Sequence, residues 1–340
     1  MDPLPWRDAW HEALYAAGRG FYVAAGGPAA HFTTATHGPA GAVLAEALLR
    51  LVGHRPRVVV DVGAGRGELA THLVTALEAL DDSGEPLGDH PGRTARPVRV
   101  VAVDVVDRPP GLDERVEWLR CPGGTALPPS LGDGDRELED ALVIAHEWLD
   151  VVPCTIAEVD ADGTLREVLV DVTGAETLGA PVAGADLAWA RQHWPTREPG
   201  DRVEVGRARD EAWADLVGRV RSGTLVAVDY GHTRGSRPHE GTLTAYVSGR
   251  QTHPVPDGSC DITAHVAMDT LDADEVTGQR AALRALGVRG ATPPHELART
   301  DPVAYLEALA RTGAEALLID PAGFGAFWWA VKRVRAATVT

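Results

Sequence analysis

The chain has 340 residues, of which 44% are hydrophobic and 24% are charged. These proportions are typical of a folded globular protein and exclude a disordered, collagen-like or coiled-coil chain as an overall description. The formal net charge of −17 argues against a nucleic-acid partner, because proteins of that class normally present a basic surface. The charge is compatible with a basic protein or peptide partner, and it also serves solubility.

The cysteines and the histidines of the polar loops show no ligand pattern. Cys121, Cys154 and Cys260 are far apart and form no zinc or paired-cysteine motif, which predicts a reduced, cytoplasmic protein. His232 and His239 lack metal-ligand spacing, so we predict no metal. No signal peptide is recognised at the start, and no apolar run reaches the ~18 residues of a membrane span, so no membrane span is expected.

The first part of the chain predicts helices followed by a buried strand. Apolar spacing predicts helices over residues 6–17 and 39–52, within a helical N-terminal extension of residues 1–55. A β-branched run at 57–62 predicts a strand buried on both faces, as in a parallel sheet. A helix is expected at 68–80.

Alternation of strands and helices then predicts a doubly wound, mostly parallel, Rossmann-like α/β sheet. Its first part is expected at residues 56–153 and an inserted cap of a hairpin and a helix at 154–200. The rest of the core sheet is expected at 201–340, together with loops on the substrate side. The remaining elements are expected as strands at 98–103, 115–119, 141–145, 203–205, 224–229, 316–319 and 324–334, a hairpin at 155–172, and helices at 186–193, 210–220 and 302–311.

A glycine-rich turn at residues 61–67 lies between the first buried strand and a helix. Its G-x-G-x-G spacing differs from the G-x-G-x-x-G of a pyrophosphate-binding turn, and it lacks the lysine of a P-loop. S-adenosylmethionine fits the charges better than a dinucleotide does: Asp61 could bind its ammonium group, the backbone of the turn its carboxylate, and Asp104 its ribose hydroxyls. An ordinary tight turn and a dinucleotide site are the alternatives. The predicted cofactor residues are Asp61, Gly63, Ala64, Gly65, Gly67, Asp104 and Val105.

A second group of polar residues follows the strand predicted at 141–145. His146, Glu147 and Asp150 should lie near the glycine turn, because ligands bind at the carboxyl ends of strands in such sheets. Two carboxylates and an imidazole could bind a cationic nucleophile and accept its proton. The alternative is that Glu147 or Asp150 only caps the following helix.

Several colinear segments resemble one known family over residues 10–335. They resemble the MidA-like S-adenosylmethionine-dependent methyltransferases, which include the mitochondrial arginine methyltransferase of complex I assembly. The segments are HFTTA (31–35), VVDVGAGRGELATHL (59–73), VDV (103–105), IAHEWLDVVP (144–153), RVEV (202–205), DYGH (229–232), GTLTAY (241–246) and DITAHV (261–266). Two departures concern the site: His146 replaces the asparagine of the family, and Thr36-His37 replaces its Pro-Glu.

The resemblance implies a class I methyltransferase that uses S-adenosylmethionine and methylates a polar nitrogen such as that of protein arginine. The expected catalytic residue is Glu147, supported by Asp150, His146 and His265. Asp229, Tyr230 and Glu204 are expected to bind substrate. His265 could instead be structural, Asp229-Tyr230 a strand-ending turn, and Glu204 a residue of a solvated edge.

Three other functions remain open from the sequence. The first is a small-molecule O- or N-methyltransferase, with His146 as the base. The second is a non-catalytic assembly factor that binds S-adenosylmethionine, and the third is an NAD-dependent oxidoreductase, which the missing G-x-G-x-x-G disfavours. The expected partner is a protein or small-molecule methyl acceptor, and a homodimer is compatible with the sequence.

Overall fold

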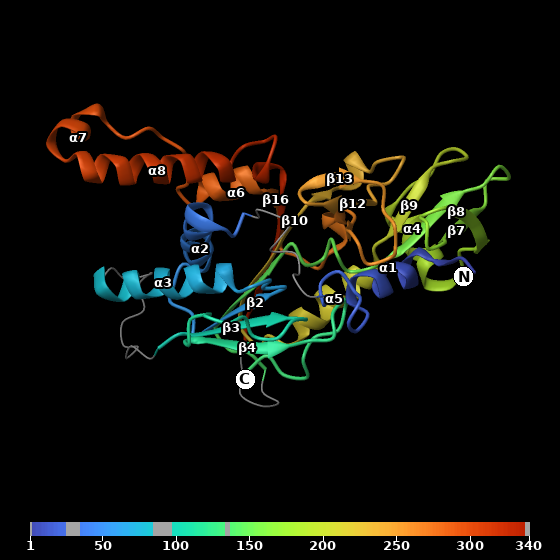
Figure 1. The fold of residues 1–340 in the computed structure, drawn as a ribbon, viewed down its shortest axis with the longest axis horizontal. Coiled ribbons are helices and arrows are strands. Elements are labelled where there is room, and N and C mark those ends of the chain that lie inside the picture. The colour runs from blue at the N-terminus through green and yellow to red at the C-terminus, as the bar shows by residue number, and fades with distance from the viewer. Residues whose placement is uncertain (1, 25–34, 84–96, 133–136, 337–340) are drawn as a thin grey trace.

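The computed structural model describes residues 2–24, 35–83, 97–132 and 137–336. Two sheets dominate the fold, a larger one with helices on both faces and a smaller one beside it (Figure 1). Among the described helices, none is both long and apolar enough to span a membrane.

The larger sheet has seven strands in the order β16-β17-β10-β5-β2-β3-β4. The strands from β10 to β4 are parallel, whereas β17 runs antiparallel to both of its neighbours. The chain moves outward from β2 through β3 to β4 and then returns to β5 on the other side of β2, so the switch point lies between β2 and β5. The strands are β2 (Val58–Val62), β3 (Arg99–Asp104), β4 (Val116–Arg120), β5 (Ala141–His146), β10 (Gly223–Asp229), β16 (Glu275–Gly278) and β17 (Trp328–Val334). This is the doubly wound, mostly parallel α/β sheet that the sequence predicts.

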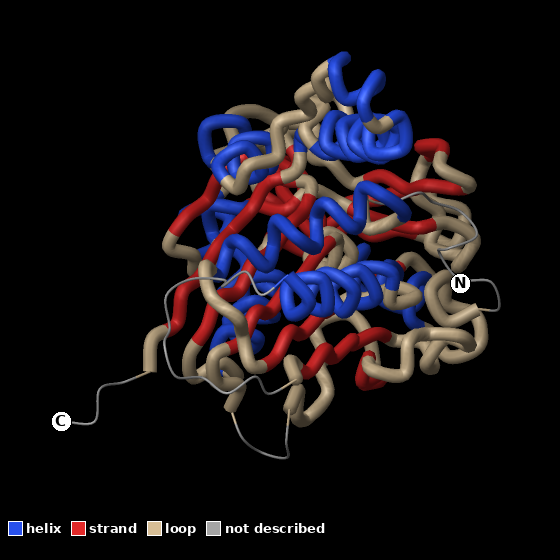
Figure 2. The backbone as a smooth tube through the Cα atoms, turned by 90° about the vertical axis from the view of Figure 1, so that its left-hand side faces the viewer, coloured by secondary structure: helices blue, strands red, loops and turns tan. Residues whose placement is uncertain are grey.

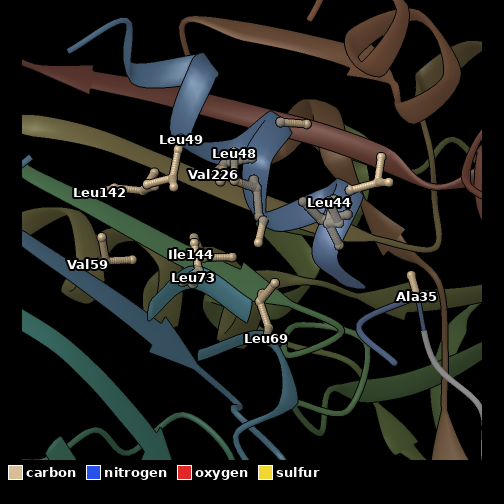
Figure 3. Packing of buried hydrophobic residues seen from close by; sticks show 14 of the residues in the cluster. Ala35, Leu44, Leu48, Leu49, Val59, Leu69, Leu73, Leu142, Ile144 and Val226 are labelled. Carbon is tan, nitrogen blue, oxygen red and sulfur yellow. The ribbon is translucent and has the colours of Figure 1, made fainter. Parts of the chain in front are cut away.

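Alternate residues of these strands enter two separate cores. Side chains such as Val59, Leu142 and Ile144 pack under helices α2 (Gly38–Val52) and α3 (Glu68–Ser83), as Figure 3 shows. Their neighbours in the strands, such as Val60 and Val143, pack under α5 (Arg207–Gly218) on the opposite face. Figure 2 shows helices stacked in front of the strands of the sheet. Both faces are therefore covered, which explains why the strands read as continuous apolar runs.

The smaller sheet joins the start of the chain to its middle. Strand β1 pairs with β7, β7 with β6 and β8, and β6 with β9. Helix α1 buries Trp6 and Trp10 in the core of this sheet. The elements are β1 (Leu4–Pro5), α1 (Trp6–Tyr15), β6 (Thr155–Val159), β7 (Leu165–Val170), β8 (Glu176–Pro181), α4 (Gly184–His193) and β9 (Arg202–Val205).

Two predicted elements differ from the structure. The strand expected at 203–205 does not return to the larger sheet; as β9 it pairs with β6, and its buried valines pack with Trp189 of α4. The strand expected at 316–319 is the end of a long helix, α8 (Pro302–Leu318), because Ala314 and Leu318 pack in the core shared with α2.

The remaining elements are short. Strands β12 (Thr244–Val247), β13 (Arg250–Thr252) and β14 (Asp261–Thr263) form one small sheet, and β11 (Gly231–His232) pairs with β15 (Val266–Ala267). Helices α6 (Gln279–Ala285) and α7 (His295–Thr300) precede α8, and a 3-10 turn at Phe324–Ala326 precedes β17.

Candidate active site

A cavity of about 490 Å³ lies at the carboxyl ends of β2, β3 and β5. This is the position that a doubly wound sheet offers to ligands, and the volume is within the ~300–1,000 Å³ typical of small-molecule sites. The wall opposite the sheet comes from the segment after α1 and from β12 and β14. The cavity therefore lies between the larger sheet and the elements packed against the smaller one.

The glycine turn needs glycine at three positions because Gly63, Gly65 and Gly67 all have positive φ, at 74°, 61° and 82°. Gly63 and Gly65 line the cavity. A Cβ atom at Gly67 would lie 2.6 Å from Leu112 Cδ1. Gly67 thus allows close packing, and it is not among the residues that line the cavity.

Asp104 ties this turn to the end of β3. Its Oδ2 accepts a hydrogen bond from the Gly65 N–H at 2.8 Å, and its Oδ1 accepts bonds from the N–H groups of Val105 and Val106 at 2.7 and 3.3 Å. Burial raises the pKa of Asp104 to about 6, although these backbone bonds oppose the rise. Asp104 and Val105, both predicted cofactor residues, line the cavity.

Asp61 supplies a buried carboxylate at the end of β2. Its Oδ2 has no hydrogen-bond partner among the described residues. Burial, followed by the charge of Asp104, raises the pKa of Asp61 to about 7. A buried carboxylate that lines a cavity and keeps one oxygen without a hydrogen-bond partner suits a ligand ammonium group.

The loop after β5 is held in an unusual conformation. Glu147 has φ of 51°, which is uncommon for a residue with a side chain, and its N–H bonds to the Val228 carbonyl at 2.9 Å. The N–H groups of Leu149 and Asp150 both donate to Asp229 Oδ2, at 3.0 and 3.2 Å. Asp229 is completely buried and is not part of the cavity wall. Asp229, which the sequence predicts to bind substrate, therefore holds the loop in place.

Glu147 and His146 lie side by side in the cavity wall. Glu147 Oε1 lies 3.4 Å from His146 Nδ1 and makes no hydrogen bond to the described residues. Burial, and then the charges of Asp150 and Asp261, raise the pKa of Glu147 to about 8. Burial lowers the pKa of His146 to about 4, so its imidazole is neutral, and its Nε2 also lacks a hydrogen-bond partner among the described residues.

Asp150 completes this acidic group. Its Oδ2 accepts a hydrogen bond from Thr263 Oγ1 at 2.8 Å, while Oδ1 has no hydrogen-bond partner in the described chain. Burial raises the pKa of Asp150, and the nearby Arg209 opposes the rise. The buried Arg209 donates to the carbonyls of Asp150, Val152 and His265 at 2.8, 3.0 and 2.9 Å. The sequence analysis missed Arg209, whose only signal is a charged residue on the apolar side of α5.

Tyrosines form much of the remaining wall. Four of the five tyrosines of the chain, Tyr15, Tyr22, Tyr230 and Tyr246, line the cavity. Tyr22 Oη donates to Asp261 Oδ1 at 2.6 Å, and burial raises the pKa of Tyr22, so its hydroxyl stays neutral. Tyr230 is the one tyrosine among the residues that the sequence predicts to bind substrate.

The comparisons with known proteins agree with this geometry. A family model described as "Putative S-adenosyl-L-methionine-dependent methyltransferase" matches residues 42–288. The chain belongs to this family. A solved structure from Burkholderia thailandensis bound to S-adenosyl-homocysteine is 26% identical, with a TM-score of 0.71 over 98% of this chain and 89% of that one. A native structure from the same organism is also 26% identical, with a TM-score of 0.70 and the same coverage. Among curated proteins no match is found.

These findings confirm the predicted MidA-like resemblance, the Rossmann-like fold and an enzyme that uses S-adenosylmethionine. The residues of the cavity fit this cofactor, because Asp61 offers an unpartnered carboxylate oxygen and the glycine turn lets the backbone come close. Within the described ranges, no cluster of three His, Cys, Asp or Glu side chains could hold a metal ion.

Two more predicted site residues of the methyltransferase lie outside the cavity wall. Glu204 is buried, and its carboxylate accepts hydrogen bonds from the N–H and hydroxyl of Thr242 and from the Leu243 N–H. The His265 N–H donates to Thr242 Oγ1 at 2.8 Å, and its ring stacks 5.9 Å from that of Tyr230. Both residues therefore hold neighbouring segments in place.

His37, one of the two departures from the family, lines the cavity, with its Nε2 3.5 Å from Glu68 Oε1. Residues 31–34 of the family-like segment lie outside the described residues.

Proposed function

We propose that this methyltransferase transfers the methyl group to a cationic nitrogen of the guanidinium type, as in protein arginine. The observation that carries the proposal is the composition of the cavity lining, which includes four tyrosines together with Glu147, Asp150 and Asp261. Carboxylates hold a guanidinium group in a bidentate fork, and the faces of tyrosine rings attract cations. A neutral or anionic acceptor would leave several buried carboxylates without a favourable partner.

The chain offers a position for each part of the cofactor. We assign the ammonium group to Asp61, the ribose hydroxyls to Asp104, and the carboxylate to backbone N–H groups around Gly63 and Gly65. When bound, S-adenosylmethionine supplies an electrophilic methyl group on a positively charged sulfur.

The free carboxylate oxygens beside this site suit the acceptor. Glu147 Oε1 and Asp150 Oδ1 are both buried and without hydrogen-bond partners among the described residues, so each can accept one N–H of a guanidinium fork. Holding the acceptor in this way would orient its nitrogen for in-line attack on the methyl carbon.

Glu147 is also the proposed proton acceptor. The nitrogen must lose one proton as the new N–C bond forms, and a carboxylate with a pKa of about 8 binds that proton well near neutral pH. A bound cation favours the ionised form of Glu147, so acceptor binding itself would prepare the base.

One observation favours a second candidate, a small-molecule O- or N-methyltransferase. His146 is neutral, lines the cavity and has a free Nε2, and a neutral imidazole can deprotonate a hydroxyl or amine. The family has asparagine at this position, so the acceptor of this chain could differ from that of its relatives.

The test uses S-adenosylmethionine with a labelled methyl group and fractions of a cell extract from the source organism. We expect label in protein, recovered as methylarginine after acid hydrolysis. Glu147→Gln should bind S-adenosylhomocysteine as wild type does but lose about 100-fold or more of the transfer, the usual contribution of a general base. Glu114→Gln, a change at an exposed residue, is the matched control. Label found only in the small-molecule fraction, or full activity of Glu147→Gln, would contradict the proposal.

A further inference from the structure

The proposed function leaves one aromatic side chain of the cavity unused, that of Phe324. It lies on the 3-10 turn Phe324–Ala326, lines the cavity and is half-buried. The turn leads directly into β17, whose first residue, Trp328, pairs with Asp229 at the carboxyl end of β10. Phe324 therefore enters the cavity at the end of β10, on the side of Tyr230.

This position is remote from the residues proposed to hold the cofactor, Asp61 and Asp104, which lie at the ends of β2 and β3. Three strand spacings separate β17 from β2 in the larger sheet, or about 14 Å. Glu147, the proposed proton acceptor, follows β5 and lies closer. Burial raises the pKa of Tyr230, and the charge of the nearby Glu147 adds to that rise. Phe324 thus lines the half of the cavity that is left for the methyl acceptor.

One buried ring supports three side chains of this half. Phe327 is completely buried and is not among the residues that line the cavity. Its ring meets those of Tyr230 and Phe324 edge to face, with centroids 4.1 and 5.8 Å apart. It also lies 5.8 Å from the ring of His146. Because aromatic pairs prefer edge-to-face geometry, Phe327 favours one orientation of the rings around it.

Gln279 holds the backbone that carries Phe324. Its side chain is completely buried, and its Nε2 donates to the carbonyls of Phe324 and Leu318 at 2.8 and 3.3 Å. Its Oε1 accepts a hydrogen bond from Trp329 Nε1 at 2.9 Å, and its backbone N–H donates to the Phe327 carbonyl at 2.7 Å. A buried amide whose donors and acceptor are all bonded is held in one orientation. Gln279 therefore fixes the segment from Phe324 to Trp329 at three points.

A phenyl ring has a specific use in a cavity lined by carboxylates. The ring forms no conventional hydrogen bond, but its face attracts a cation. When carboxylates such as those of Glu147 and Asp150 bind a guanidinium group in its plane, the two flat faces of the group remain free for rings.

We infer that Phe324 packs against the guanidinium face of the acceptor and makes the site prefer a planar cation. Phe327 and Gln279 are positioning residues, because they hold Phe324 without lining the cavity themselves. The inference rests on the proposed function, since it concerns the acceptor end of the same site.

Titration of two small probes into the full chain saturated with S-adenosylhomocysteine tests this inference. Methylguanidinium carries the planar cation, and N-methylurea has nearly the same shape without the charge. Wild type should bind methylguanidinium about tenfold or more tightly than N-methylurea, because carboxylates and ring faces favour the cation. Calorimetry, or NMR titration where the affinity is millimolar, measures both.

Phe324→Leu removes the ring and keeps an apolar side chain. It should weaken methylguanidinium binding about 5- to 30-fold, the effect of a cation–π contact in a desolvated site, and change the affinity for S-adenosylhomocysteine by less than about twofold. Phe324→Tyr keeps a ring face and should bind methylguanidinium as wild type does. Tyr305→Leu is the matched control, because Tyr305 is a half-buried residue of α8 that does not line the cavity.

Gln279→Met tests the positioning role. It removes the donor to the Phe324 carbonyl, so it should weaken methylguanidinium binding in the wild-type background. In the Phe324→Leu background it should have no further effect, because the ring that Gln279 holds is then absent. Thermal unfolding and binding of S-adenosylhomocysteine confirm that each variant is folded. Equal losses in the two backgrounds would overturn the positioning role.

The outcomes separate this inference from the proposed function. Equal affinity of wild type for the two probes would overturn both. A clear preference of wild type for methylguanidinium that Phe324→Leu retains in full would overturn the inference alone, and the proposed function would stand.

Discussion

Replacing Glu147 by glutamine should stabilise the fold, and should do so more at pH 8 than at pH 6. Burial raises the pKa of this carboxyl from 4.5 to about 8, with Asp150 and Asp261 adding to the rise. The folded protein therefore holds the proton of Glu147 more tightly than the unfolded chain does. The stability that this proton contributes is fully present below pH 4.5 and is lost as the pH rises through about 8.

The magnitude follows from the size of the shift. Each pH unit between the two pKa values costs about 1.36 kcal/mol, so wild type should lose up to about 2.7 kcal/mol between pH 6 and pH 8 through Glu147 alone. Because the side chain is 23% exposed, water reduces this loss to about 1–2 kcal/mol. Glutamine carries no charge at either pH, and Glu147→Gln therefore avoids the loss.

Urea unfolding of wild type and Glu147→Gln at pH 6, 7, 8 and 9 measures this difference. The free energy of unfolding of the variant, relative to wild type, should rise from pH 6 to pH 8 and then level off. Glu114→Gln, at an exposed position, should show no such trend. A difference between variant and wild type that stays constant from pH 6 to pH 9 would refute the reasoning, because it would mean that Glu147 does not titrate in this range in the folded protein.

Three further substitutions test the proposed cofactor residues Asp104 and Asp61 and the contacts by which Arg209 holds the loop after β5. Asp104→Ala should weaken S-adenosylhomocysteine binding by tenfold or more in calorimetry, because it removes both the proposed ribose contact and the bond that holds Gly65; unchanged affinity would exclude the proposed role. Affinity for the same ligand should rise from pH 6 to pH 8 as Asp61, with a pKa of about 7, becomes ionised, and Asp61→Asn should remove that dependence. Arg209→Met should lower the free energy of unfolding by about 3–5 kcal/mol in urea titration, because it leaves buried carbonyls and carboxylates without their cation; a loss below about 1 kcal/mol would contradict this.

The larger sheet could be predicted because its strands are buried on both faces. Runs such as VVVDV in β2 and ALVIAH in β5 have no polar alternation, which indicates a parallel sheet covered by helices. For the run Ala316–Ile319 the same reasoning predicted a strand where the structure has the end of a helix. Four consecutive apolar residues fit the end of a buried helix as well as a strand. The partner of β9 could not be predicted, because its sequence fits either sheet.

Only those residues of the candidate site that lie at the ends of predicted strands could be predicted from the sequence. Asp61, Asp104 and Glu147 each lie at the carboxyl end of a parallel strand, so the fold alone brings them together. The tyrosine wall depends on contacts between distant segments: Trp10 on α1 bonds to the Ile262 carbonyl at 2.8 Å across 252 positions of sequence. No local pattern encodes such a contact.

The same distant packing gives the cavity its chemistry. Helix α1 and the small sheet of β12, β13 and β14 close over the ends of the strands and exclude water from Glu147 and Asp261. This burial raises the pKa values of the two carboxyls to about 8 and 7. A carboxylate in bulk water would be ionised at neutral pH and a poor proton acceptor. These two buried carboxyls instead titrate near pH 7 to 8, so the proposed binding of a cation and the proposed uptake of a proton would both depend on the burial that lowers the stability of the fold.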